Sequence, residues 1–330
     1  HHHAGLPDPL WSRGLGDVYK RQAANLINFC SEETPRFNSI SVSGYHIREA
    51  GSTAAQEIGF AFANAIAYLE ECQKQGGDLN QVAQRVSWIF NTHNHFFEEV
   101  AKFRTLRRLW ARTVKNRFDI TDPRAQMLRT HTQTGGSTLT AQQPLNNIAR
   151  SAIQALAAVS GGVQSLALSC YDEALALPTE DAQQIALRTQ QIIAHESGAA
   201  DTIDPFAGSY YIESLTDSLE KEASKIMDHI DDLGGASASI ETGYMQTEIQ
   251  EASVSWQHEV ESNERTIVGV NAFIDPSEDA TPIFRPNHEV ADAQLNRLAE
   301  LRKNRNSEHV QSALDRLRTC LLYTSPSPRD

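Results

Sequence analysis

The sequence predicts an α/β fold built as half of a (β/α)8 TIM barrel, followed by a helical linker region. From residue 38 onward, strand-like segments alternate with amphipathic helical segments, and the unit recurs about every 40 residues. This alternation is typical of right-handed βαβ units around a parallel sheet. No Gly-x-Gly-x-x-Gly follows any predicted strand, so half a barrel is preferred to an open, doubly wound dinucleotide-binding sheet.

The elements are expected in strict alternation. Strands are predicted over residues 38–46, 84–91, 126–134 and 163–170. Helices are predicted over residues 52–74, 96–117, 140–159 and 181–195. Further along, two long helices are expected within 212–262 with a break at Gly234-Gly235, then a linker over 264–287 and a charged helical region over 288–319.

The two ends lack the pattern of the rest. Residues 1–22 show neither helical nor strand periodicity, and residues 320–330 end in Ser-Pro repeats. We therefore expect a non-native leader over 1–22 and a non-native, adapter-like tail over 320–330, both outside the fold prediction. The remaining chain divides into half of a barrel over 23–200, and the barrel end, a helical region and a linker over 201–319.

The composition is that of an ordinary soluble protein. The 330 residues are 40% hydrophobic and 22% charged, and the formal net charge is −13, which argues against nucleic acid or anionic membrane as a partner. No apolar run approaches the roughly 20 residues of a membrane helix. Four cysteines without metal-ligand spacing favour a reducing, cytoplasmic location of the bacterial type.

One face of every predicted strand is small and polar. The residues that share it are Ser39, Ser41 and Ser43; Arg85, Ser87, Ile89 and Asn91; Arg129, His131 and Gln133; and Ser165, Ala167 and Ser169. An unpaired arginine on a helix-packed face would be costly, so this face is expected to line the barrel interior. Large branched residues usually fill that interior, so small polar ones favour a channel for an elongated polar ligand. Serine can also be merely tolerated in strands, but the two arginines favour an anion such as phosphate or carboxylate.

Several long motifs occur in one order along the chain. They are "SGYHIREAG" (43–51), "RTHTQTGG" (129–136), "LTAQQPLNNIAR" (139–150), "YDEALALPTE" (171–180) and "ADTIDPFAGSYYIESLT" (200–216). With them, the chain over about residues 24–319 resembles the large subunit of the methylmalonyl-CoA mutase family. The resemblance implies the C-terminal half of the catalytic barrel, whose lumen of small polar residues admits the pantetheine arm of coenzyme A.

The resemblance also implies a cofactor and partners. The expected activity is an adenosylcobalamin-dependent radical 1,2-rearrangement of an acyl-CoA, in which a 5′-deoxyadenosyl radical takes a hydrogen from the substrate. The family's Asp-x-His-x-x-Gly cobalamin motif is absent from the sequence. The cobalt ligand is therefore expected on another domain or a small subunit, in a dimer or heteromer, and the chain alone is expected to be inactive.

Matching positions carry expected roles one by one. The resemblance implies that His46 hydrogen-bonds the thioester carbonyl, and Tyr45 beside it is grouped with the catalytic residues. The implied substrate and CoA contacts are Arg36, Asn38, Arg85, Ser87, Arg129, His131, Gln133 and Gln164. The implied contacts to the corrin ring or the deoxyadenosyl ribose are Glu49, Gly136 and Glu173, for which a structural role is the alternative; no metal ligand is implied. Strict alternation would place His46 opposite the serines, so Gly44 is expected to form a bulge that turns it inward.

Two departures from the family pattern leave the substrate open. Ala167-Leu168-Ser169 stands where His-Thr-Asn is common, and Ser137 stands where tryptophan is common. The favoured reaction is (R)-methylmalonyl-CoA to succinyl-CoA, with isobutyryl-, ethylmalonyl- and 2-hydroxyisobutyryl-CoA as alternatives. The rival classes are a non-radical acyl-CoA lyase or hydrolase and a non-catalytic partner subunit. A metal site at His93 and His95 lacks a third ligand, and an Asp172-Glu173 acid/base pair lacks a nucleophile.

Overall fold

The core of the fold is a parallel sheet, seen in a computed structural model that describes residues 16–276, 283–285 and 287–322. Its strands are β1 (Ile40–Ser43), β2 (Val86–Thr92), β3 (Arg129–Thr134) and β4 (Ser165–Ala167), in the spatial order β1-β2-β3-β4. The register places Ser41 beside Ser87 and Ser87 beside Arg129, and it places His131 beside Ser165. Equivalent positions of neighbouring strands therefore share one face.

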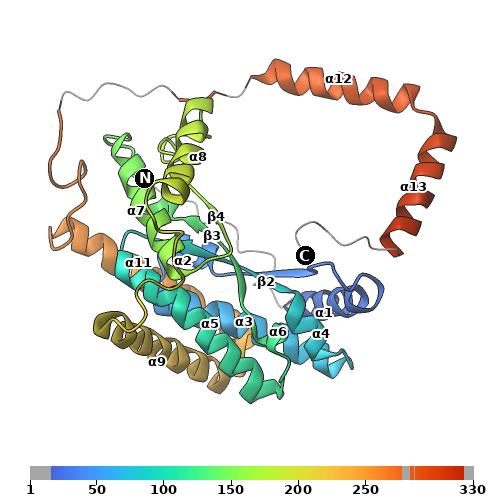
Figure 1. Ribbon diagram of the computed structural model, residues 1–330, viewed down its shortest axis with the longest axis horizontal. Helices are drawn as coiled ribbons and strands as arrows, with labels where there is room; N and C mark the ends of the chain where they lie inside the picture. Colours follow the sequence, from blue (N-terminus) through green and yellow to red (C-terminus); the bar gives the residue numbers. More distant parts are fainter. Residues whose placement is uncertain (1–15, 277–282, 286, 323–330) are drawn as a thin grey trace.

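Helices connect these strands and follow them (Figure 1). They are α1 (Gly16–Glu33), α2 (Tyr45–Glu49), α3 (Ala54–Lys74), α4 (Leu79–Arg85), α5 (Phe96–Phe118), α6 (Pro123–Gln126), the short 3-10 helix η2 (Gly136–Thr138), α7 (Asn146–Gly161), α8 (Glu180–His195), α9 (Tyr210–Asp232), α10 (Ala236–Glu241), α11 (Tyr244–Glu261), α12 (His288–Asn304) and α13 (Ser307–Leu322). α12 and α13 lie apart from the sheet, and the side chains described for them are almost all exposed.

The apolar face of the sheet is buried under helices. Trp88 and Phe90 of β2 are 1% and 0% exposed, and Trp88 packs against Phe62 of α3 and Trp110 of α5 at ring-centroid distances of 5.1 and 4.8 Å. Burying rings of this size supplies much of the driving force for folding. α9 forms a further layer against α3 and α5 (Figure 1).

The opposite face of the sheet stays partly open. Ser41 is exposed, and Ser87, Ile89, Arg129 and His131 are half-buried. A partly open face of the described sheet, together with strands in sequential order, is what half of a (β/α)8 barrel requires, because a doubly wound sheet is covered on both faces and reverses its strand order. The prediction of an α/β fold with a parallel sheet is confirmed, whereas closure into a barrel stays a proposal.

Three sequence expectations were wrong in detail. The first strand ends at Ser43, and His46 lies on the five-residue helix α2, so Gly44 forms no bulge but is the N-cap of α2 with φ −86°. Arg85 is the last residue of α4 rather than a strand residue; this helix begins after Asp78, whose side chain accepts a hydrogen bond from the Asn80 N–H at 2.9 Å, and β2 follows directly from Val86. α1 begins at Gly16, within the leader for which no regular structure was expected.

The remaining elements agree more closely with the predicted ranges. The pair of helices expected within 212–262 is split at Gly234-Gly235 as predicted, but α10 and a second break at Gly243 come between α9 and α11. The predicted linker over 264–287 includes residues outside the described part of the chain, and the tail over 320–330 lies outside it beyond residue 322. That residues 1–22 and 320–330 are non-native stays a prediction, as does the division at residue 200.

Gly44 allows β1, β2 and α3 to meet closely. Its N–H donates to the Ile89 carbonyl at 2.9 Å, and a Cβ there would lie 2.6 Å from Phe90 Cδ1 and 2.9 Å from Glu57 Cγ. Gly44→Ala should therefore lower the free energy of unfolding by about 1–3 kcal/mol through overpacking. Urea denaturation would measure this, with Ser41→Ala on the exposed face as a control expected within about 0.5 kcal/mol of the parent chain. Equal stabilities for the two variants would contradict the close packing.

Candidate functional site

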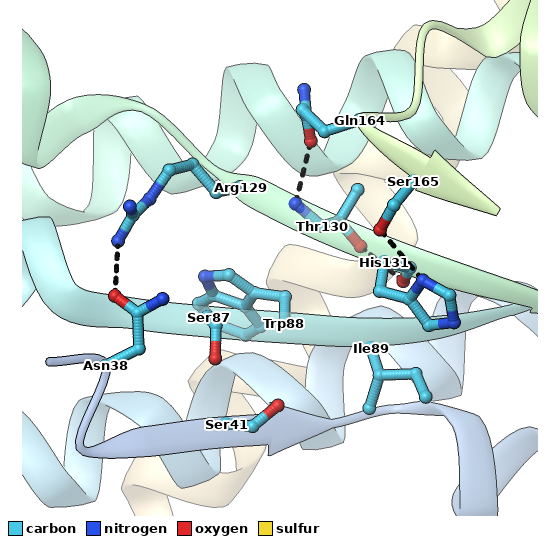
Figure 2. A pocket seen from close by; sticks show the side chains of 10 residues that line it. All are labelled: Asn38, Ser41, Ser87, Trp88, Ile89, Arg129, Thr130, His131, Gln164 and Ser165. Carbon is cyan, nitrogen blue, oxygen red and sulfur yellow. Dashed lines mark hydrogen bonds between the residues drawn. The ribbon is translucent and has the colours of Figure 1, made fainter. Parts of the chain in front are cut away.

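A pocket of about 400 Å³ lies on the open face of the sheet. The residues that line it are Asn38, Ser41, Ser87, Trp88, Ile89, Arg129, Thr130, His131, Gln164 and Ser165. Figure 2 shows their side chains, which come from all four strands and the segments just before β1 and β4. Most of the predicted substrate contacts are thus brought together. Gln133 lies further along β3, half-buried on the same face, and Arg36 is exposed ahead of β1.

The amino end of the pocket carries the positive charge. Arg129 donates to Asn38 Oδ1 at 3.2 Å and to the Gln84 carbonyl (Figure 2 shows the first contact). Burial, together with the nearby charge of Arg85, lowers the pKa of Arg129 from its usual value. Both acceptors are neutral, so the guanidinium charge remains available to an anion. Arg85, although it lies on α4, is still near this end of the pocket.

Polar side chains in the middle of the pocket are held in place by hydrogen bonds. His131 Nδ1 lies 2.8 Å from Ser165 Oγ, and burial lowers the pKa of His131 from its usual value of 6.5 (Figure 2). Gln164 Oε1 accepts the Thr130 N–H at 2.7 Å, which fixes the start of β4 against β3. His131 is therefore a neutral, oriented hydrogen-bonding group near pH 7.

The candidate catalytic histidine lies beyond the carboxyl end of β1. His46 Nδ1 is 2.9 Å from Ser43 Oγ, and its ring meets the Tyr45 ring edge-on at a centroid distance of 5.4 Å. The His46 side chain is exposed. When Ser43 donates to Nδ1, the hydrogen of the neutral ring sits on Nε2, which is then a hydrogen-bond donor.

The three predicted cofactor contacts meet around a glycine. A Cβ on Gly136 would lie 2.5 Å from Glu173 Oε1 and 3.3 Å from Glu49 Oε2. Glu49 accepts hydrogen bonds from the Asn91 side-chain amide and, at 2.9 Å, from the Ser137 N–H. We call Glu49, Gly136 and Glu173 the carboxylate cradle. It comes from α2 and from the loops after β3 and β4, at the carboxyl ends of the strands.

The cradle concentrates negative charge. Burial, and then the charge of Glu49, raises the pKa of Glu173, against the opposing effect of a hydrogen bond from Ser169. Burial, together with the charges of Glu49 and Glu173, raises the pKa of Tyr45. Two carboxylates close to one glycine suit a ligand that offers paired hydroxyl donors, and the missing Cβ is what lets the Glu173 carboxylate approach the Gly136 backbone so closely. The residues present therefore fit the ribose of the predicted cofactor.

The described part of the chain gives less support for a metal site or a membrane-spanning segment. In the described ranges there is no group of three or more His, Cys, Asp and Glu side chains arranged to hold a metal ion. His93 is largely buried, which lowers its pKa, and His95 is exposed. None of the described helices is both long and apolar enough to span a bilayer.

Sequence reasoning missed the residues that hold this site in place. Ser43 and Ser165 were assigned only to the lining, although each bonds a histidine. The buried group formed by Glu57, Lys102 and Asn91 was also missed. The available signal was a glutamate and a lysine among the apolar positions of two predicted helices.

The orientation of His131 can be tested by NMR. A pH titration of the His131 ring should give a midpoint below 6.5, because burial disfavours the charged ring. Ser165→Ala should change the tautomer of His131, read from the ring ¹⁵N shifts, since the partner of Nδ1 is lost. Ser41→Ala lines the same pocket and should leave both readings unchanged. A midpoint at or above 6.5 in the parent chain would contradict the burial of this ring.

Comparison with known proteins places this chain in a family. The methylmalonyl-CoA mutase family profile matches residues 17–325. The 2-hydroxyisobutanoyl-CoA mutase large subunit of Aquincola tertiaricarbonis is 43% identical over 298 residues, covering 90% of this chain and 53% of that protein. The methylmalonyl-CoA mutase of Escherichia coli is 42% identical, covering 90% of this chain and 42% of that protein.

A probable mitochondrial methylmalonyl-CoA mutase of Caenorhabditis elegans is 40% identical, covering 94% of this chain and 40% of that protein. The chain therefore spans about half the length, or less, of the relatives it matches. A family match over most of the chain and identities of this size lead to one conclusion: the chain belongs to the methylmalonyl-CoA mutase family.

Proposed function

We propose that this chain supplies the barrel half of an adenosylcobalamin-dependent acyl-CoA mutase that catalyses the 1,2-rearrangement of a branched acyl-CoA. The observation that carries the proposal is the order of groups along the open face of the sheet. An arginine lies at the amino end, serines and His131 lie in the middle, and His46 and the carboxylate cradle lie at the carboxyl end. This order matches an elongated ligand with an anionic end and a reactive end.

In this proposal the substrate lies along β1, β2 and β3. Arg129, Arg85 and Arg36 hold phosphate oxygens, and Asn38, Ser87 and Gln164 contact the polar arm. The strand β3 spreads its groups over roughly 16 Å, since a strand rises about 3.3 Å per residue. The thioester then reaches the carboxyl end, near His131, Gln133 and His46.

His46 is the proposed hydrogen-bond donor to the thioester carbonyl. The Ser43 hydroxyl holds the ring, so Nε2 can donate while charge develops on the oxygen during migration of the acyl group. A preorganised donor of this kind typically contributes about 3–4 kcal/mol to the stabilisation of the transition state. Tyr45 contacts the His46 ring edge-on and lies near the charges of Glu49 and Glu173.

The cradle is the proposed site for the ribose of the cofactor. Adenosylcobalamin, when bound, would supply the 5′-deoxyadenosyl radical. In this proposal Glu49 and Glu173 accept hydrogen bonds from the two ribose hydroxyls, and Gly136, which has no Cβ, lets the two carboxylates come together. The cobalt ligand is expected on a cobalamin-binding domain or small subunit outside this chain, and three of the relatives are named large subunits.

Two acyl-CoA substrates are candidates, from the named activities of the relatives and from two small residues beside the cradle. (R)-Methylmalonyl-CoA is the proposed substrate, and 2-hydroxyisobutanoyl-CoA is the second candidate, because the relatives named for these two activities are 42% and 43% identical to the chain. Ser137 bonds Glu49 and Ser169 bonds the Thr134 backbone. These small residues leave more room beside the cradle than the tryptophan and asparagine that are common in the family.

A graft tests the proposed function. The chain would replace the matching segment of the Aquincola 2-hydroxyisobutanoyl-CoA mutase large subunit, and the purified enzyme would be assayed with both acyl-CoA candidates, with and without adenosylcobalamin. Rearrangement of either substrate that requires adenosylcobalamin is the expected result. A folded graft without this activity would refute a catalytic role and favour a non-catalytic partner subunit, and turnover without the cofactor would favour a lyase or hydrolase.

His46→Ala in the active graft tests the assigned donor. The turnover number should fall by about 10²–10³-fold, the usual loss for one preorganised hydrogen-bond donor. His95→Ala removes an exposed histidine outside the site and should leave the turnover number unchanged. If the two variants turned over equally, His46 would have no role in the chemistry.

A further inference from the structure

A buried ion pair lies directly behind the carboxylate cradle. The Lys102 side chain is 0% exposed, and its ammonium contacts Glu57 Oε2 at 2.8 Å, Glu99 Oε2 at 2.5 Å and the Asn91 carbonyl at 2.7 Å. Lysine is almost never fully buried unless its charge is paired in this way. The unusual feature is that one of its three acceptors belongs to the backbone of the central strand.

The ion pair takes the place of a missing strand. β1 ends at Ser43, which pairs with Ile89, so β1 offers no partner to Asn91 two residues further along β2. On that side Glu57 Oε1 accepts the Asn91 N–H at 2.8 Å, and the Lys102 ammonium donates to the Asn91 carbonyl. The N–H and the carbonyl of Asn91 are therefore hydrogen-bonded to two buried side chains. Without them, this side of β2 would have no hydrogen-bond partner at Asn91.

The fixed side chain of Asn91 in turn holds one residue of the cradle, Glu49. The Asn91 side chain is 0% exposed, and its amide NH₂ donates to Glu49 Oε1, while Glu49 Oε2 accepts the Ser137 N–H at 2.9 Å. Glu49 is the last residue of the five-residue helix α2, so its own element restrains it little. These two hydrogen bonds, with a longer one from the Ser137 hydroxyl to Glu49 Oε1 at 3.4 Å, set the direction in which the Glu49 carboxylate faces Gly136.

We propose that Asn91, anchored by the buried Lys102–Glu57 pair, is a positioning residue that fixes the Glu49 carboxylate for the ribose of the cofactor. This inference rests on the proposed function for the identity of the ligand. It goes beyond that function because Asn91, Glu57 and Lys102 are fully buried and have no assigned contact with substrate or cofactor. A long acidic side chain held by fixed donors loses less conformational entropy when it binds a ligand.

Hydrogen exchange in the 330-residue chain tests the positioning role without catalysis. Asn91→Ala removes the donor to Glu49 and leaves the Asn91 backbone contacts in place. The Ser137 amide should then exchange about tenfold faster or more, because its acceptor is no longer held. The Gly135 amide donates to the Thr92 carbonyl at 2.8 Å and is the internal reference for the same loop.

A merely structural role predicts a different pattern. If Asn91 only stabilised the strand end, the exchange rates of the Gly135 and Ser137 amides would rise together, and that result would overturn the inference. Asn94→Ala is the matched control, since Asn94 lies three residues further, bonds Gln154 and does not contact Glu49. It should leave the Ser137 amide unchanged. Asn91→Asp keeps the shape of the side chain but places a carboxylate against the carboxylate of Glu49. Hydrogen exchange of the Ser137 amide should therefore increase at least as much as in Asn91→Ala.

Binding of 5′-deoxyadenosine separates this inference from the proposed function. The parent chain should bind it, and Asn91→Ala should weaken binding about tenfold. In one outcome, Asn91→Ala speeds up exchange at Ser137 and not at Gly135, but the parent chain does not bind 5′-deoxyadenosine. That outcome would support Asn91 as the residue that positions Glu49 and would refute the ribose site. Binding to the parent chain with an unchanged Ser137 amide in Asn91→Ala would refute the positioning role and keep the proposed function.

Discussion

The burial of Trp88 and Phe90 under the helices is the constraint on which the rest of the structure depends. The two rings lie nearly parallel, 5.7 Å apart, and both are closed off from solvent by α3 and α5. Because the side-chain period of a strand is two, this burial forces Ser87 and Ile89 onto the opposite face. A shift of one residue would bury the serines and expose the rings, so the register of the whole sheet is strongly fixed.

The proposed catalytic and cofactor-binding residues lie beyond the strands, where the alternation of buried and exposed side chains ends. β1 is one of the short strands, and just beyond it Gly44 begins the helix that carries Tyr45, His46 and Glu49. On β2, Asn91 should by parity face the pocket with Ser87, yet it is fully buried against Glu49 and the Lys102–Glu57 pair. The regular part of the sheet thus forms the wall of the proposed channel. Its ends place the groups that would meet the reacting part of a ligand.

The sequence predicted what depends on local patterns. The serine face, the main helices and the family followed from alternation and from long motifs, because these signals lie within single elements. The position of Arg85 could not be predicted by parity, because Arg85 ends the short helix α4 and the strand begins only at Val86. α2 is too short to show a helical period, so His46 seemed to end a strand. Glu57 and Lys102 are 45 residues apart, and only the folded chain brings them together.

The central claim is that the polar face of the sheet is the wall of an acyl-CoA channel that leads to His46. A crystal structure of the graft with a bound acyl-CoA tests it most directly. The expected complex has phosphate oxygens near Arg129, the pantetheine arm over Ser41 and Ser87, and the thioester oxygen within hydrogen-bond distance of His46. An acyl-CoA bound elsewhere, or a polar face filled by side chains of a neighbouring segment, would contradict it.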